Sequence, residues 1–234
     1  MKVILLAAGL GTRLLPITEK IPKCLVEING VSMLEFWLRK LNIKSLSPVV
    51  VNTHHFAQEV INKINEINLT ERVEIFHEKE LLGTAGTLRA IAEPTSETEI
   101  LVVHCDNYSE IDIEEFLRAH RNRNEKCSIS MAVFETSNVQ MSGMVNMDED
   151  NIVRDFIEKP LYSDLTQANA AIYAFDPRAV KEICEKFSNA EDIARDILPH
   201  FVGRIQAYRF EGFHMDMGIL ENLKTIKDIF QETK

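Results

Sequence analysis

Short apolar runs alternate along the first half of the chain with segments whose apolar residues recur every three or four positions. Runs of the first kind, rich in Val, Ile and Leu, are typical of strands that are buried on both faces of a parallel sheet. Segments of the second kind predict amphipathic helices that pack against such a sheet. The predicted strands are KVILLA, PVVVN, VEIF and EILVVHC. The alternation therefore predicts an α/β fold with a mostly parallel sheet flanked by helices.

Two of the predicted helices begin with a capping box, in which a polar N-cap residue is followed three positions later by Glu. Ser32 and Glu35 fill these positions in SMLEFWLRKL, and Asp112 and Glu115 fill them in IDIEEFLRAHR. A third start, in DPRAVKEICEKF, has an Asp cap followed by Pro at the first helical position. The other predicted helices are AQEVINKINEI, a segment from Gly86 to Ile91, and ILENLKTIKDIF, in which Leu220, Leu223, Ile226 and Phe230 share one stripe.

The second half of the chain contains four further strand-like runs with more alternation of apolar and polar residues: SISMAVF, NIVRDFI, ANAAIYAF and RIQAYRF. No internal repeat, low-complexity tract or Pro/Gly/Ser-rich linker separates this half from the first. We therefore predict a single domain over residues 1–234, with a first half of about 1–108 and a second half of about 109–234 that share one sheet.

Composition narrows the class of protein. The 234 residues carry 26 basic and 36 acidic side chains, a net charge of -10, which argues against a broad nucleic-acid or anionic membrane surface. No run approaches the ~18 uncharged apolar residues of a membrane span, and the N-terminal apolar run is too short for a secretion signal. The cysteines form no CxxC pair and suggest reduced thiols in a cytoplasmic protein: Cys24, Cys105, Cys127 and Cys184.

The stretch AAGLGTRLLPITEKIPK directly follows the first predicted strand. Its glycines allow backbone NH groups to approach phosphate oxygens, although an ordinary strand-to-helix turn would look similar. A dinucleotide fingerprint needs a third glycine where this chain has Leu14, and a Walker loop needs a GK pair that is absent. Arg13 and Lys23 follow the glycines and would suit a triphosphate, which favours a phosphate-binding loop.

These residues closely resemble the signature of the sugar-1-phosphate nucleotidyltransferases, the nucleotide-sugar pyrophosphorylases. The matching positions are Gly9, Gly11, Thr12, Arg13, Leu14, Pro16, Thr18, Pro22 and Lys23. The resemblance continues in order through ELLGTAG, VVHCDN, FIEKP, NAAIYAF and HMDMGILENL, so that it covers nearly the whole chain. Within the family, these motifs most resemble those of the mannose and heptose 1-phosphate guanylyltransferases. The fold that this resemblance implies is the Rossmann-like nucleotidyltransferase type A fold.

The resemblance also implies a role for individual residues. The implied nucleotide-binding residues are Leu6, Ala8, Gly9, Gly11, Thr12, Arg13, Lys23, Glu78, Gly83 and Thr84. The implied sugar-phosphate-binding residues are Gly143, Glu158, Lys159 and Asn169. The implied ligands of a Mg²⁺ cofactor are Asp106 and Asp216, and the implied catalytic residues are Arg13, Lys23 and Asp106.

The residues themselves support some of these roles. Asp106 follows a predicted strand, and ligands of open α/β sheets collect at the carboxyl ends of strands. Mg²⁺ prefers one or two carboxylates plus substrate phosphates, a set that Asp106 and Asp216 could complete, although either Asp alone could be a solvated loop residue or a helix cap. Glu158 and Lys159 could equally form an exposed ion pair, and Asn169 could lie on the exposed face of a strand.

The base and the sugar are less tightly constrained. In the family the residue five positions before the glycine of the LGTAG-like segment faces the base, and here it is Glu78. A carboxylate only accepts hydrogen bonds, and guanine offers adjacent donors, so this residue favours GTP, although cytosine also has an amino donor. Three residues depart from the common family pattern near the metal and sugar positions, which leaves the sugar open: Cys24, Cys105 and Ala171.

We therefore predict an Mg²⁺-dependent enzyme that joins a nucleoside triphosphate, with GTP favoured, to a hexose or heptose 1-phosphate and releases pyrophosphate. Two alternatives remain at this stage: a cytidylyl-, uridylyl- or thymidylyltransferase on another phosphate ester, and a non-catalytic regulatory relative that binds nucleotide-sugars. The predicted partners of the protein are a nucleoside triphosphate and a sugar 1-phosphate, and binding to nucleic acid or to a membrane is not expected. The oligomeric state is open, and a homodimer is one option.

Overall fold

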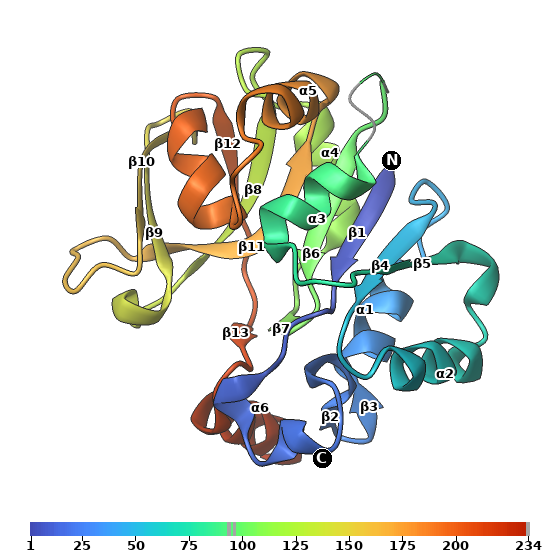
Figure 1. Ribbon diagram of the computed structural model, residues 1–234. Helices are drawn as coiled ribbons and strands as arrows, with labels where there is room; N and C mark the ends of the chain where they lie inside the picture. The colour runs from blue at the N-terminus through green and yellow to red at the C-terminus, as the bar shows by residue number, and fades with distance from the viewer. Residues whose placement is uncertain (93–94, 96, 233–234) are drawn as a thin grey trace. The chain divides into compact units, whose positions relative to one another are not determined.

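The computed structural model describes residues 1–92, 95 and 97–232 (Figure 1). The chain forms two compact units that interleave along the sequence. Unit 1 comprises residues 1–81, 103–110 and 212–234, and unit 2 comprises residues 82–102 and 111–211. The predicted single domain, with its halves meeting near residue 108, stays a prediction.

The sheet of unit 1 is built on three parallel strands, β1 (Lys2–Leu6), β4 (Val49–Thr53) and β5 (Val73–His77), with β4 in the middle. The residues of β4 are buried throughout, as expected for a central strand with an apolar run. Leu6 lies opposite Asn52, and Thr53 lies opposite His77. The carboxyl ends of the three strands are therefore neighbours, so that the residues just after them share one edge of the sheet.

The helices of unit 1 are α1 (Met33–Lys40), α2 (Ala57–Ile67) and α6 (Leu220–Glu232). In α1 the Ser32 side chain accepts a hydrogen bond from the Glu35 backbone NH, which is the predicted capping interaction. Two short antiparallel pairs complete the unit, β2 (Glu27–Ile28) with β3 (Val31–Ser32) and β7 (Asn107–Ser109) with β13 (His214–Asp216).

Strand β6 (Ile100–His104) contributes its first three residues to unit 2 and its last two to unit 1. In unit 1 its chain continues alongside β1, because the backbone NH of Cys105 donates to the carbonyl oxygen of Leu6 over 3.0 Å. Asp106, the next residue, therefore also lies at the carboxyl edge of the β1 strand.

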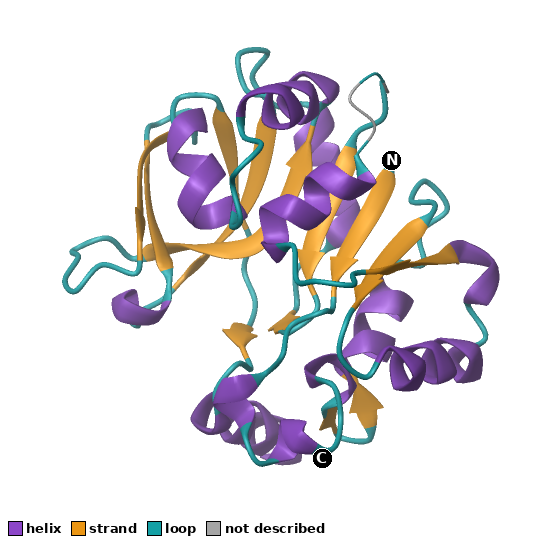
Figure 2. Cartoon of the chain, in the orientation of Figure 1, coloured by secondary structure: helices purple, strands orange, loops and turns teal. Residues whose placement is uncertain are grey.

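Unit 2 contains the strands β8 (Ile129–Glu135), β9 (Gly143–Met147), β10 (Val153–Glu158), β11 (Gln167–Phe175) and β12 (Ile205–Arg209). They are hydrogen-bonded in the order β10-β9-β11-β8-β12, and all these pairs are antiparallel except β8 with β12. The helices of this unit are α3 (Gly83–Ile91), α4 (Ile113–Arg121) and α5 (Pro177–Lys186). Helix α4 packs against β8 and β12, and α5 packs against β11. Figure 2 shows helices beside the strands of each unit.

The predicted α/β class, a mixed and mostly parallel sheet flanked by helices, is confirmed. Two local predictions are corrected. Helix α3 starts at Gly83, three residues before the predicted start at Gly86. Leu220, predicted to lie on the apolar stripe of the last helix, is 46% exposed, whereas Leu223 and Ile226 are buried as predicted. The side chain of Phe230 lies outside the described residues. Among the residues that the structure describes, no helix has the length and apolar character needed to span a membrane.

Candidate active site

The glycine-rich stretch forms a loop of short 3₁₀ turns directly after β1. Gly11 has a φ of +67°, the left-handed region that favours glycine, and its carbonyl oxygen accepts from Leu14 NH and from the Thr18 hydroxyl. A Cβ at Gly11 would lie 2.7 Å from the Thr18 methyl carbon, so no larger residue fits. Arg13 lies in the turn Thr12–Leu14 that Gly11 begins. The other predicted loop residues of this unit, Leu6, Ala8, Gly9 and Thr12, lie at the end of β1 or on the same loop.

Lys23 is the centre of a charged cluster in unit 1. Its side chain is almost buried, and its Nζ donates to an Asp106 carboxylate oxygen. The same Nζ lies 3.8 Å from an Asp216 oxygen, and the Arg13 guanidinium lies 3.8 Å from the other Asp216 oxygen. All four residues were predicted from the sequence, and the structure brings them together. One buried lysine is thus shared by two aspartates that are 110 positions apart in the chain.

Backbone pairing explains why the two aspartates meet. Strand β13 pairs with β7 so that Asp216 lies opposite Asn107, and the backbone NH of Met217 donates to the carbonyl oxygen of Asp106 over 3.0 Å. The backbone NH of Gly218 donates to an Asp216 carboxylate oxygen over 2.6 Å and helps to fix its orientation. The sequence did not predict this short strand pair, although it predicted both aspartates.

The electrostatics of the cluster follow from burial and from the shared lysine. Burial and the nearby Asp106 charge raise the pKa of Asp216 above its usual value. Burial opposes ionisation of Asp106 too, yet the attraction of Lys23 keeps the pKa of Asp106 below its usual value. Burial lowers the pKa of the neighbouring His214 to about 3, so this imidazole is neutral at pH 7. The site therefore places two carboxylates beside the cations Lys23 and Arg13, with a neutral imidazole at His214.

The cluster fits a hard divalent cation by the chemistry of its donors. Asp106 and Asp216 offer carboxylate oxygens, the ligands that Mg²⁺ prefers, and both side chains are partly accessible. The described part of the chain contains no group of three or more His, Cys, Asp or Glu side chains that could hold a metal ion. When substrate phosphates supply further oxygen ligands, the protein is expected to supply only two carboxylate ligands.

The Cys24 and Cys105 thiols, which replace common family residues, do not add reactive groups to the cluster. Burial raises the pKa of Cys24 to about 12, and burial also raises the pKa of Cys105 well above its usual value. Both thiols therefore stay protonated and behave as small apolar side chains at neutral pH.

Glu78 lies just after β5 and is buried, with 2% of its surface exposed. Its backbone NH donates to the Thr53 carbonyl oxygen over 2.8 Å. Its carboxylate accepts a 2.8 Å hydrogen bond from the side-chain amide of Asn52. The sequence analysis did not single out Asn52. The pattern that could have indicated it is a polar residue at the carboxyl end of an otherwise apolar strand.

Gly83 and Thr84 begin helix α3 in unit 2. Gly83 has a φ of +72°, and a Cβ there would lie 2.3 Å from the Glu191 carbonyl oxygen. The Thr84 hydroxyl accepts from the Ile193 backbone NH over 2.8 Å and lies 3.3 Å from an Asp192 oxygen. Both residues therefore fix the helix start against residues 191–193 of the same unit, contacts that the sequence did not predict.

The predicted sugar-phosphate residues lie on the strands of unit 2. Gly143 begins β9 and lies opposite Glu158, the last residue of β10. Lys159 follows with a φ of +46°, and its Nζ lies 3.5 Å from a Glu158 oxygen. Burial raises the pKa of Glu158, the nearby Lys159 charge opposes that rise, and Asp192 adds to it. The structure thus brings Gly143, Glu158 and Lys159 together.

Asn169 lies on β11 at an irregularity in the pairing with β8. Its side-chain oxygen accepts from the Ala171 NH over 2.9 Å, and its amide donates to the Tyr173 hydroxyl over 2.7 Å. Ala171 has a φ of +54°, a conformation uncommon for a residue with a side chain. The side chain of Asn169 therefore holds a strained turn of the strand and orients a tyrosine that the sequence did not single out.

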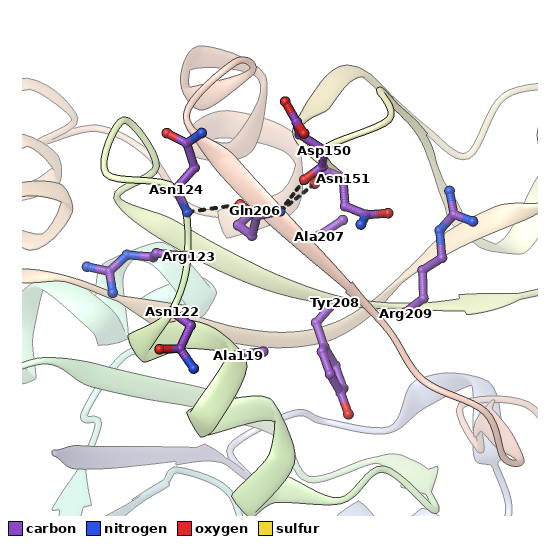
Figure 3. Close-up of a pocket in the computed structure, with 10 residues that line it drawn as sticks. All are labelled: Ala119, Asn122, Arg123, Asn124, Asp150, Asn151, Gln206, Ala207, Tyr208 and Arg209. Carbon is purple, nitrogen blue, oxygen red and sulfur yellow. Dashed lines mark hydrogen bonds between the residues drawn. The ribbon is translucent and has the colours of Figure 1, made fainter.

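Unit 2 also has an open cavity of about 600 Å³ beside β12, shown in Figure 3. Gln206 crosses it, accepting from the Asn124 NH and donating to the carbonyl oxygens of Asp150 and Asn151. Arg123, on its wall, is already paired with Asp176 at 3.0 Å. None of the residues predicted for the site lines this cavity.

The sequence profile of the nucleotidyl transferase family matches residues 2–232, and the chain belongs to this family. Among the curated relatives is the mannose-1-phosphate guanylyltransferase catalytic subunit beta of Drosophila pseudoobscura pseudoobscura, 29% identical over 93% of this chain and 59% of the relative. The chain spans about 60% of the length of the curated relatives it matches.

Solved structures agree on the fold. HddC from Yersinia pseudotuberculosis, in a complex with GMP-PN, superposes with a TM-score of 0.78 at 23% identity, covering 98% of this chain and 99% of that one. A provisionally named glucose-1-phosphate thymidylyltransferase from Bacillus anthracis, in complex with sucrose, gives a TM-score of 0.85 at 19% identity, with coverage of 98% and 94%. Both likenesses concern the fold.

Proposed function

We propose that this protein transfers the guanylyl group of GTP to a hexose or heptose 1-phosphate, giving a nucleotide-sugar and pyrophosphate. The observation that carries the proposal is the sharing of buried Lys23 between Asp106 and Asp216, with Arg13 beside Asp216, next to a glycine loop. Membership of the nucleotidyl transferase family supports the reaction class. The name of the guanylyltransferase relative and the GMP-PN bound to HddC support the choice of base.

In the proposed reaction, an oxygen of the sugar phosphate attacks the α-phosphorus of GTP in line with the leaving group. A new oxygen–phosphorus bond forms, the bond to the bridging oxygen of the β-phosphate breaks, and pyrophosphate leaves with that electron pair. Positioning and charge neutralisation dominate such chemistry. We assign Arg13 and Lys23 to the triphosphate, because a guanidinium and an ammonium both stabilise the charge that develops on its oxygens.

We assign Mg²⁺ to Asp106 and Asp216. When bound, the cation would neutralise charge on the reacting phosphate oxygens. In the structure, the positive charge of Lys23 offsets the negative charge of both aspartates. Binding of metal and triphosphate together would replace these ion pairs with interactions to the cation and to the phosphates. The two aspartates would hold the cation, and Lys23 would pair with the phosphates.

On the sugar side, we assign Lys159 to the incoming phosphate and Glu158 to the sugar hydroxyls. Lys159 is half exposed, which leaves its ammonium accessible to a ligand. Glu158 has acceptor oxygens for hydroxyl groups, and Gly143 lies opposite it without a side chain. Asn169 is assigned to the same binding site, where it also orients Tyr173.

The competing functions make different demands on the site. A uridylyl- or thymidylyltransferase needs partners for one base donor between two acceptors, which an amide satisfies better than the Glu78 carboxylate. A silent regulatory relative is expected to have lost one of the charged residues, yet Arg13, Lys23, Asp106 and Asp216 are all present. We therefore favour an active guanylyltransferase. We also propose a cytoplasmic location, because all four cysteines are free thiols.

The test is pyrophosphate release across the four ribonucleoside triphosphates and dTTP, each paired with hexose and heptose 1-phosphates, with Mg²⁺ or with EDTA. GTP should be preferred and EDTA should abolish turnover. Asp106→Asn should reduce turnover by at least about 100-fold, because one ionised metal ligand is lost, as in other cases of lost charge stabilisation. Asp112→Asn, which changes a helix cap elsewhere, is the control and should leave the rate unchanged. Full turnover in EDTA, or near-normal turnover of Asp106→Asn, would refute the metal role.

A further inference from the structure

We propose that Asn52 is a positioning residue for base recognition. Its side-chain amide orients the Glu78 carboxylate and ties it to the phosphate-binding loop, so that base and phosphate recognition share one rigid connection. The inference rests on the proposed function, in which Glu78 reads the base of GTP. It assigns a role to a residue that does not itself belong to the phosphate loop or to the charged cluster.

Three neighbouring strand ends meet at Asn52. The residue is the fourth of β4, the central strand, and is buried with 3% of its surface exposed. On one side the backbone NH of Ala7, the first residue after β1, donates to Asn52 Oδ1 over 2.6 Å. On the other side Asn52 Nδ2 donates to Glu78 Oε1 over 2.8 Å. A single side chain thus links the start of the glycine loop to the residue that follows β5.

The chemistry of the partners fixes which way the amide points. The Ala7 NH can only donate, and an ionised carboxylate can only accept. Asn52 must therefore turn its oxygen to Ala7 and its nitrogen to Glu78, and the reversed amide would place like groups together at both ends. Asn is the residue of this length that offers both a donor and an acceptor, so no other side chain of similar size satisfies both neighbours.

The backbone of Glu78 is held as firmly as its side chain. Its NH donates to the Thr53 carbonyl oxygen, and its carbonyl oxygen lies 2.8 Å from His54 Nδ1. With the backbone fixed, the Asn52 amide selects the side-chain rotamer of Glu78. The bond from Asn52 therefore fixes the orientation of the carboxylate. Guanine presents N1–H and N2–H side by side, a pair that suits a carboxylate held in one orientation.

Calorimetric binding of GTP and of UTP to the whole protein tests the inference without requiring turnover. Asn52→Ala should lower the affinity for GTP relative to UTP by about tenfold, the effect of one charged hydrogen bond. Glu78→Gln should lower the same ratio at least as much. The double variant should lose little more than Glu78→Gln alone, because Asn52 acts through Glu78. Thr53→Val is the matched control, since the Thr53 side chain is equally buried on β4 and contacts His77 instead.

A polarity exchange gives the sharper test. Asn52→Asp alone places two carboxylates together and should lower the thermal midpoint. When Glu78→Gln is added, the new amide at position 78 can donate to the carboxylate at position 52, and that carboxylate still accepts from the Ala7 NH. The double variant N52D/E78Q should therefore recover the thermal midpoint relative to N52D. It should prefer UTP or dTTP to GTP, because the base would now meet an amide.

The outcomes separate the two proposals. If Glu78→Gln changes the base preference and Asn52→Ala does not, or if Thr53→Val changes it equally, the positioning role is wrong and the proposed function stands. If GTP binds with the expected variant pattern but no sugar phosphate is ever guanylylated, the proposed function is wrong and the positioning role stands. If no variant changes the base preference of the wild-type protein, the role of Glu78 and that of Asn52 both fall.

Discussion

Polar residues at the ends of strands have the roles that we propose for unit 1. Glu78 follows β5, whose residues are largely exposed, and it was predicted from the family resemblance alone. Asp106 follows β6, and its position could be predicted from an apolar run that ends in a charged residue. Asn52 has the same signal and was missed because an amide at a strand end is a common structural residue. Its partners, Ala7 and Glu78, become neighbours only once β1, β4 and β5 are paired.

The pairing of Lys23 with two aspartates could be predicted only in part. The motif places a lysine after the glycines, and a phosphate was its expected partner. In the structure the partners are Asp106 and Asp216, and their approach depends on a pair of three-residue strands. Strands this short have no periodicity that a sequence could reveal. The assigned roles of these residues stay predictions until they are tested.

Glu158 provides a prediction about pH at the residue scale. Burial raises its pKa in the folded state above the ordinary value. Below the ordinary pKa of about 4.3 the carboxyl is protonated in the folded and unfolded states alike. As the pH rises through the raised pKa, the folded state must ionise a partly buried group, so its stability falls. Glu158→Gln removes this loss. The difference in unfolding free energy, variant minus wild type, should therefore increase from pH 4 to pH 7.

Urea unfolding at the two pH values measures this difference. Glu114→Gln, which removes an equal charge from an exposed position of α4, is the control and should show no such gain. An equal difference between Glu158→Gln and wild type at both pH values would contradict the prediction.

At the scale of elements, helices with capping signals were predicted most closely. The caps Ser32, Asp112 and Asp176 each accept from the backbone NH three residues later, as their spacing predicts. Helix α3 lacks such a signal and starts at Gly83, because that residue takes a left-handed conformation against Glu191. That contact lies more than 100 positions away in the chain, and no local pattern indicates it.

Two of these caps should differ sharply in their contribution to stability. Asp176 is buried and also pairs with Arg123 at 3.0 Å and with Arg178 at 2.6 Å, whereas Asp112 is exposed. Asn is a good cap, so an Asp→Asn change at either site keeps the helix start. Asp176→Asn should nevertheless cost about 3 kcal/mol of unfolding free energy, because it removes the buried carboxylate and leaves Arg123 with only the more distant Glu99 at 4.0 Å.

Asp112→Asn is the matched control and should cost less than about 0.5 kcal/mol, the usual range for surface substitutions. Urea unfolding of both variants at pH 7 is the measurement. Similar losses in the two variants would mean that capping alone, rather than the buried ion pair, accounts for the contribution of Asp176.

At the scale of the molecule, the residues assigned to the triphosphate and metal lie in unit 1, and those assigned to the sugar phosphate lie in unit 2. Arg13, Lys23, Asp106 and Asp216 come from three separate segments that together make unit 1. A ligand that bridges these four side chains connects segments that are distant in the chain. Binding of nucleotide and metal should therefore stabilise the folded state of the whole unit.

This stabilisation can be measured by thermal unfolding with GTP and Mg²⁺ added. A ligand at 100 times its dissociation constant adds about 2.7 kcal/mol, and in a chain of this size each kcal/mol shifts the midpoint by about 2–4 °C. Wild type should therefore gain about 5–11 °C with GTP and Mg²⁺ at that excess. EDTA, or the Asp106→Asn change, should remove most of the gain, because the triphosphate then meets carboxylate charge without a cation between them. An equal gain with and without Mg²⁺ would show that the nucleotide binds independently of the two aspartates and would contradict the assignment of the metal to them.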